Sequence, residues 1–163
     1  MPHSGIKHLL AAMLTSVTLA GSILATPAFA GTPGSTASIN LDEHGLALDG
    51  YDPVAYFDTG KATLGVETIT ASYDGAQYRF ASDAHRKLFL GDPKKYLPEF
   101  GGFCAVGTSF GEKVDVDPLT GKVVEGKLYL NSNAKAQAIF DKDTPGTISR
   151  AQHNWPEVKD KPL

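Results

Sequence analysis

The chain has 163 residues, with 15 Lys and Arg against 18 Asp and Glu, and a formal net charge of -3 at pH 7. The charge balance is mildly acidic, and the sequence has neither a basic block nor an alternation of basic and aromatic residues. It therefore lacks the electrostatic signature of a nucleic-acid-binding protein. The length fits a single domain.

The first thirty residues have the pattern of a secretory signal peptide. A basic start precedes the apolar run LLAAMLTSVTLAGSILA, and PAFA before Gly31 supplies a small-residue cleavage site. We predict cleavage near Ala30 and therefore a periplasmic or secreted protein without a transmembrane anchor after cleavage. The alternative is an uncleaved membrane anchor, but the apolar run is short for a bilayer and polar residues interrupt it.

A flexible linker is predicted over residues 31–44, because GTPGSTASIN is too small and polar to bury enough apolar surface to order itself. The folded domain is expected over residues 45–160. Within it, apolar and polar side chains alternate over residues 68–73 and again over residues 77–80, and DGA between them supplies a hairpin turn.

Two helical segments are predicted after this hairpin. Ser82 is a suitable N-cap for a helix from Asp83 to Leu90, with Leu88 and Phe89 on its inner side. The sequence DPKKYL then opens a second helical turn with proline at the first helical position.

The remaining part of the chain alternates strand and helix signals. EKVDVD, KVVEG and KLYLN are expected as short strands, with turns at PLTG and EG. SNAKAQAIFDKD predicts a capped helix with Ala134, Ala138 and Ile139 on one face, and TPGTISRAQHNW predicts a last helical stretch. The fold class is therefore α+β: a small antiparallel β-sheet with short helices packed on one side, in a single domain.

Several blocks of the sequence, in this order and spacing, resemble the exported bacterial YHS-domain proteins: GYDPVAYF, YDGAQYRFAS, FASDAHRKLFLGDPKKYLPEFGGFCA, GKLYLN and NWP. The resemblance runs from about Leu48 to Pro156. It implies a fold similar to small metal-sensing or metal-delivering modules of copper-handling and other metal-transport proteins. The ligand that it implies is a metal ion, with copper favoured and zinc or iron as alternatives. A periplasmic or membrane metal-transport protein is the implied partner.

The metal site implied by this resemblance is only partly retained. Where the metal-binding relatives carry three cysteines, this chain has Ala55, Ala81 and His85. Of these three positions, only the histidine can still coordinate a metal ion.

His85 and Cys104 are the candidate metal ligands. His85 falls in the first turn of its predicted helix, where the helix dipole favours a neutral imidazole. Cys104 is the single cysteine of the sequence and therefore has no partner for an intrachain disulfide. An N/S pair suits copper(I) or zinc, with a third ligand from a main-chain carbonyl, Asp52, Tyr51 or a partner. The structural alternatives are a half-exposed polar histidine and a small buried cysteine.

Catalytic motifs are not recognised, since the sequence lacks G-x-S-x-G, H-E-x-x-H and a phosphate-cradling glycine loop. An enzymatic function is accordingly not predicted. Two alternatives to metal handling stay open. The first is a non-catalytic protein-interaction module that has lost the metal site. The second is thiol chemistry by a dyad of Cys104 and His85.

Overall fold

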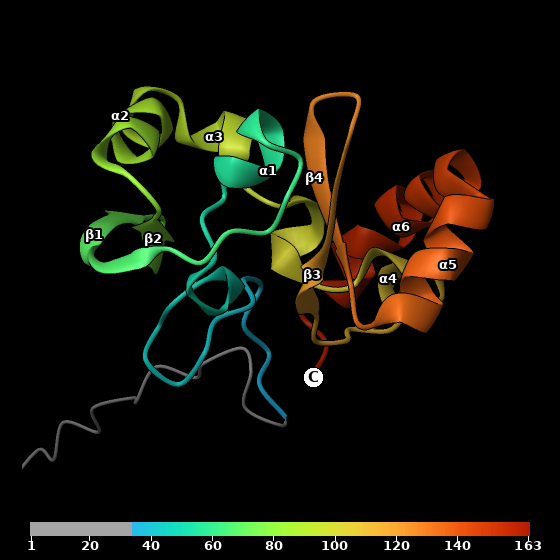
Figure 1. The fold of residues 1–163 in the computed structure, drawn as a ribbon. Coiled ribbons are helices and arrows are strands. Elements are labelled where there is room, and N and C mark those ends of the chain that lie inside the picture. The colour runs from blue at the N-terminus through green and yellow to red at the C-terminus, as the bar shows by residue number, and fades with distance from the viewer. Residues whose placement is uncertain (1–33) are drawn as a thin grey trace, which may run out of the picture.

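The structure is a computed structural model that describes residues 34–163. This part of the chain forms two antiparallel β-hairpins with helices packed on them (Figure 1). In chain order the elements are η1 (Leu48–Gly50), α1 (Ala55–Asp58), β1 (Val66–Tyr73), β2 (Ala76–Phe80), α2 (Asp83–Gly91), α3 (Pro93–Tyr96), η2 (Glu99–Gly102), α4 (Ala105–Ser109), β3 (Asp117–Val124), β4 (Lys127–Asn131), α5 (Ala134–Lys142) and α6 (Thr144–Val158). The α+β class is confirmed, with two small sheets in place of one. The predicted signal peptide, residues 1–30, lies outside the described residues.

The first hairpin and its following helix agree with the sequence prediction. Strands β1 and β2 pair antiparallel around the turn at Asp74, which adopts the left-handed conformation that aspartate tolerates. Helix α2 begins after Ser82, whose hydroxyl oxygen accepts the His85 backbone N–H at 3.1 Å. Of the two residues expected on the inner side of α2, Phe89 is buried and Leu88 is exposed.

The second hairpin corrects one predicted turn. PLTG lies inside β3 and is not a turn, and the register between the strands shifts between Asp117 and Lys122. The hydroxyl of Thr120 spans this irregularity, because it donates to the Asn131 carbonyl at 2.7 Å and accepts the Asn131 N–H at 2.9 Å. The predicted EG turn is confirmed between β3 and β4, with Glu125 in the left-handed region.

The C-terminal helices are where the sequence predicts them, but one of them presents a different face. Helix α5 is capped by Asn133, whose side chain accepts the Ala136 N–H at 3.0 Å. Its buried positions are Ala136 and Phe140, four residues apart. The expected face was wrong, since Ala134, Ala138 and Ile139 are all exposed. Weak apolar periodicity in an alanine-rich helix therefore did not identify its inner side.

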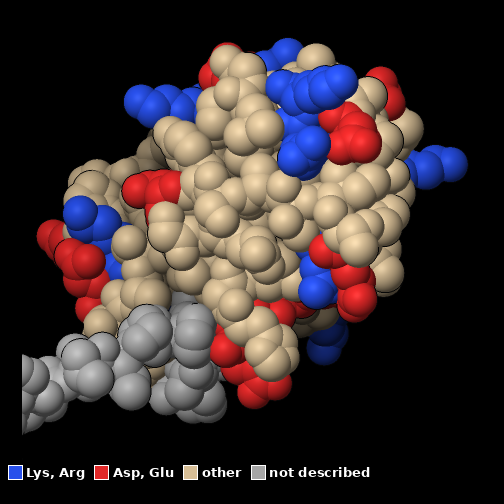
Figure 2. Space-filling model, turned by 90° about the vertical axis from the view of Figure 1, so that its left-hand side faces the viewer, with Lys and Arg blue, Asp and Glu red and all other residues tan. Residues whose placement is uncertain are grey.

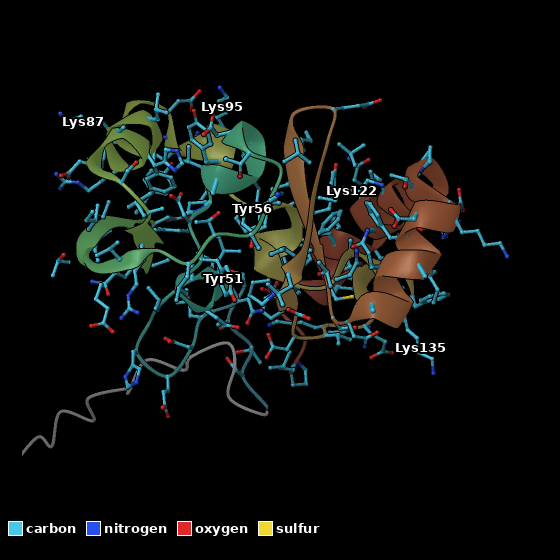
Figure 3. The ribbon with its side chains drawn as sticks, viewed as in Figure 1. Tyr51, Tyr56, Lys87, Lys95, Lys122 and Lys135 are labelled. Atoms are coloured by element: carbon cyan, nitrogen blue, oxygen red, sulfur yellow. The ribbon has the colours of Figure 1, made fainter. Side chains whose placement is uncertain are left out.

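The two hairpins are joined by a buried tyrosine. Tyr56 of α1 donates its hydroxyl to the Pro118 carbonyl of β3 at 2.8 Å (Figure 3). Gly121 leaves room for the ring, because a Cβ at this position would lie 2.2 Å from Cε1 of Tyr56. The ring belongs to a small apolar cluster that contains residues from both halves of the domain, namely Leu48, Tyr56, Leu128 and Leu130.

The described part of the predicted linker, residues 34–44, packs on the folded body. The Gly34 N–H donates to the Leu163 carbonyl at 3.1 Å, and the Asn40 N–H donates to the Gly101 carbonyl at 2.8 Å. Partners far along the chain therefore satisfy main-chain groups of this small polar segment, and its flexibility stays a prediction.

Charges of both signs are interspersed on the surface. On the face shown in Figure 2, lysine and arginine side chains lie close to acidic ones around a largely uncharged centre. Within residues 34–163, no helix combines the length and the apolar character needed to cross a membrane.

Candidate functional site

A buried carboxylate joins three elements beside the first hairpin. Asp52 is 0% exposed. Its Oδ1 accepts the Val54 N–H at the start of α1, and its Oδ2 accepts the Ala81 N–H after β2, both at 2.8 Å. A buried carboxylate is stable only when its oxygens are hydrogen-bonded. Asp52 therefore fixes α1 against the corner between β2 and α2.

His85 is held by the same carboxylate. Its Nδ1 lies 2.6 Å from Oδ2 of Asp52, and its side chain is 16% exposed. An ionised aspartate only accepts hydrogen bonds, so the shared hydrogen is assigned to Nδ1 of the imidazole. In the neutral ring this tautomer leaves the lone pair on Nε2.

A second carboxylate faces that lone pair. Oδ2 of Asp58, the last residue of α1, lies 3.5 Å from Nε2 of His85, and the Asp58 side chain is 63% exposed. This separation is longer than a good N–H···O hydrogen bond. Two donor atoms each about 2.1 Å from a tetrahedral metal ion are about 3.4 Å apart. The spacing of the two side chains therefore suits a shared cation.

The three positions identified by the YHS resemblance meet around Asp52. The Ala55 N–H donates to the Asp52 carbonyl at 3.2 Å, while Ala81 and His85 both bond to its carboxylate. The two alanine methyl groups offer no donor atom, so His85 is the one of the three that can ligate. Sequence reasoning named Asp52 only as a third ligand and missed Asp58, for which no motif or spacing gave a signal.

Cys104, the other predicted ligand, has a different environment. It is 1% exposed, and its Sγ accepts the N–H groups of Gly107 and Ser132, each at 3.3 Å. The same sulfur lies 3.8 Å from Oδ1 of the buried Asn131. The thiol therefore caps α4 and ties this helix to the end of β4.

The structure does not bring His85 and Cys104 together. Figure 1 shows α2, which carries His85, and α4, which Cys104 caps, on opposite sides of the β3–β4 hairpin. The chain crosses between them through α3 and η2 and then pairs Cys104 with Leu130 of β4. The two residues share no hydrogen-bonding partner within the described part of the chain.

Residues 34–163 contain no cluster of three or more His, Cys, Asp or Glu side chains arranged to hold a metal ion. The candidate site accordingly offers two protein ligands, the Nε2 atom of His85 and the carboxylate of Asp58.

Comparison with family models, with curated proteins and with solved structures gives no match for this chain.

Proposed function

We propose that this protein binds a divalent transition metal ion through Nε2 of His85 and the carboxylate of Asp58. The observation that carries the proposal is the 2.6 Å hydrogen bond between Asp52 and Nδ1 of His85. It points the free ring nitrogen toward a second carboxylate at 3.5 Å. Histidine ligands in metal sites almost always donate their other N–H to such a partner, which fixes the tautomer and raises ligand basicity.

The donor set favours particular metals. Imidazole nitrogen and carboxylate oxygen suit copper(II) and zinc. The expectation of copper(I) depended on a thiolate ligand from Cys104, which lies elsewhere in the fold. Copper(II) is expected to bind more tightly than zinc, following the general order of affinities for divalent ions. Two protein ligands leave coordination positions for water or for a donor from a partner. Such a site exchanges its metal easily, as a metal-handling protein requires.

Two sequence features support the same proposal. The YHS resemblance implies metal handling, and the predicted signal peptide would direct the protein to the periplasm or the exterior. We therefore propose an exported metal-handling protein that receives its ion from, or passes it to, a transport partner in that compartment. Iron is a weaker candidate, because divalent iron lies well below copper in the general order of affinities for such sites.

Calorimetric titration of the purified protein with copper(II) and zinc tests the proposal. His85→Asn and Asp58→Asn should each weaken binding at least tenfold. Asp52→Asn should lower the affinity about 10- to 100-fold. Loss of the carboxylate that bonds the other ring nitrogen of a histidine ligand typically has an effect of this size. Binding should also weaken as the pH falls, since protons compete for the imidazole.

Matched controls separate this site from others. Cys104→Ser should leave the affinity unchanged, and so should replacing the surface histidines His44 and His153 with asparagine. A variant lacking His3 and His8 excludes binding by the first thirty residues. If neither metal binds more tightly than micromolar, the metal-binding proposal is wrong, and the protein is better explained as a non-catalytic protein-interaction module. Tight binding that survives His85→Asn would place the metal elsewhere.

A further inference from the structure

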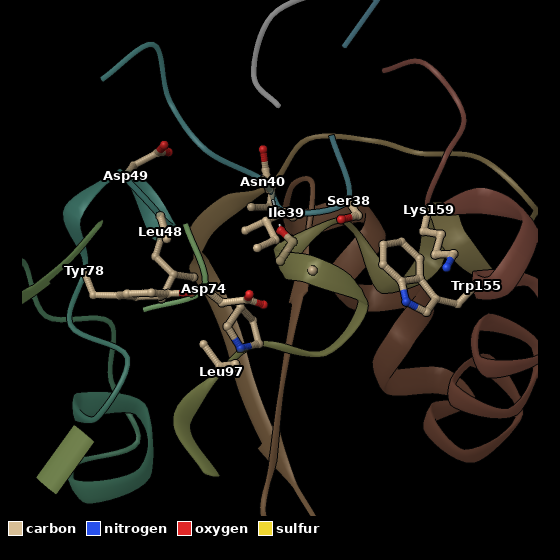
Figure 4. Close-up of a pocket in the computed structure, with 15 residues that line it drawn as sticks. Ser38, Ile39, Asn40, Leu48, Asp49, Asp74, Tyr78, Leu97, Trp155 and Lys159 are labelled. Carbon is tan, nitrogen blue, oxygen red and sulfur yellow. Dashed lines mark hydrogen bonds between the residues drawn. The ribbon is translucent and has the colours of Figure 1, made fainter. Parts of the chain in front are cut away.

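A cavity of about 310 Å³ opens between the N-terminal segment, η1, η2 and α6 (Figure 4). Its size is at the lower end of the range of small-molecule binding sites. Most of its wall is apolar, and the largest apolar side chains lining it are Ile39, Leu48, Tyr78, Leu97, Val116 and Trp155. The cavity does not include His85, Asp58 or Cys104. It is therefore a second candidate site, separate from the proposed metal site.

A tyrosine hydroxyl in the cavity wall has no hydrogen-bonding partner within the described residues. Tyr78 is 2% exposed, and its hydroxyl makes no hydrogen bond with any of residues 34–163. Its ring packs on Phe89, and Figure 4 shows the side chain running from its strand toward Asp74. Burial, with the Asp74 charge as a smaller cause, raises the pKa of Tyr78, so the phenol stays protonated. The ring is buried, whereas the hydroxyl oxygen keeps some access from the cavity and is free to bond a ligand there.

Two carboxylates line the cavity, that of Asp74 beside Tyr78 and that of Asp49 on the other side of Leu48 (Figure 4). Neither Asp49 nor Asp74 has a hydrogen bond or ion pair from its side chain within the described residues. The pKa of Asp49 is raised by partial burial first, and then by the negative charges of Asp115 and neighbouring aspartates. Among the described residues the lining contains a single cation, Lys159, which Figure 4 places beside Trp155 at the other end from Asp49. The end with the two carboxylates therefore holds uncompensated negative charge.

We propose that this cavity binds a small organic ammonium ion with an apolar body. The ammonium group donates to the Asp74 carboxylate and to the Tyr78 hydroxyl oxygen, which has no partner within the described residues, and the more distant Asp49 adds negative charge at the same end. The hydrocarbon body lies against Ile39, Leu97 and the indole of Trp155. A cation at this end also relieves the repulsion between the acidic groups, whereas a carboxylate ligand would increase it.

Trp155 allows a direct test, because it is the single tryptophan of the sequence and lines the cavity. Its fluorescence is followed during titration with three probes of similar size: phenethylamine, phenethyl alcohol and 3-phenylpropionate. Saturable binding is expected for phenethylamine, at least tenfold weaker binding for the alcohol, and the weakest binding for the acid. The affinity for the amine should rise as the pH increases through the titration of Asp49.

Conservative variants identify the groups that hold the ammonium ion. Asp74→Asn should weaken amine binding about tenfold, the size of one hydrogen bond to a charged group, and leave binding of the alcohol unchanged. Asparagine suits this position because Asp74 has a φ of 50°. Tyr78→Phe should weaken amine binding severalfold without lowering the melting temperature, since it removes an unpartnered hydroxyl. Asp58→Asn is the control and should affect metal titrations alone.

Three outcomes would overturn the proposal. The first is the absence of a saturable change in Trp155 emission up to millimolar phenethylamine. The second is equal binding of the amine and the acid, which would show that the carboxylates do not select charge. The third is amine binding unaffected by both Asp74→Asn and Tyr78→Phe in folded proteins. Each outcome leaves the metal proposal untouched, because that proposal is tested by different titrations.

Discussion

The surroundings of His85 and Cys104 differ in what they leave available for chemistry. Asp52 bonds one nitrogen of His85, and the other nitrogen faces an exposed carboxylate. The Cys104 sulfur accepts two backbone N–H groups and lies beside a buried amide, all within the C-terminal core. His85 is oriented and keeps a free donor atom, whereas the Cys104 sulfur is already occupied by hydrogen bonds within the fold.

The comparison shows that residue type alone does not identify a ligand. Imidazole and thiol are both good metal donors, and sequence reasoning joined them for that reason. What separates them is the number of contacts that the protein itself makes to the donor atom. Substitutions at Asp52 and at Cys104 test this distinction, and a surface ion pair away from both residues provides a reference for a small effect.

The largest expected effect follows from Asp52→Ala. This change leaves two backbone N–H groups, those of Val54 and Ala81, and one imidazole nitrogen without their acceptor. We expect the free energy of unfolding to fall by about 3–5 kcal/mol, because three hydrogen-bonding groups lose their acceptor and each such loss costs about 1–3 kcal/mol. Urea denaturation measures it. Asp58→Ala is the matched control and should cost under about 1 kcal/mol because its side chain is largely exposed. Equal stability of the two variants would mean that Asp52 does not organise the site.

Cys104→Ala should have an intermediate effect. The variant leaves the N–H groups of Gly107 and Ser132 without the sulfur that accepts them, and we expect a loss of about 1–3 kcal/mol. Cys104→Ser should cost less, since its hydroxyl oxygen accepts the same bonds. Alkylation of the native protein should be far slower than alkylation in denaturant, because Cys104 is 1% exposed. Rapid native alkylation would contradict a purely structural thiol.

The smallest effect concerns a surface pair in the C-terminal half. Nζ of Lys122 lies 2.6 Å from Oδ1 of Asp141, and both side chains are about half exposed, at 46% and 47%. The hydrogen bond from Lys122 is the main cause that lowers the pKa of Asp141 below 3.8. A depressed acid pKa stabilises the fold above the unfolded value and loses this effect as the pH falls through the folded value.

Asp141→Asn should therefore cost at most about 0.5 kcal/mol at pH 7 and nothing measurable well below pH 3.8. Melting temperatures of the two proteins at both pH values measure the difference. A gap that persists in acid would have to come from the other contact of Asp141, its hydrogen bond from Gln137 at 3.1 Å.

Local signals in the sequence were enough for the elements that depend on neighbouring residues. The cap at Ser82 and the hairpin turn at Asp74 were both predicted, because such features are decided within a few residues. The PLTG turn was wrong because a distant backbone group, that of Asn131, bonds Thr120 and keeps this segment in the strand.

The candidate site was only partly predictable for the same reason. His85 and Asp52 were both named, but their bond joins residues 33 positions apart and depends on how α1 packs against the β2–α2 corner. Asp58 gave no signal because it faces His85 only after that packing. The separation of Cys104 follows from the path of η2, where Phe100 adopts the left-handed conformation that is uncommon for a bulky residue.

The two ends of the described chain lie side by side. The Gly34 N–H donates to the Leu163 carbonyl at 3.1 Å, and the Leu163 N–H donates to the Ser35 carbonyl at 2.9 Å. A fusion partner attached after Leu163 would therefore emerge next to Gly34. A short glycine-rich connection would also be enough to join the two ends. The exposed turn at Gly75 is then a suitable place to open a circularly permuted chain, because adjacent termini and exposed turns favour such rearrangements.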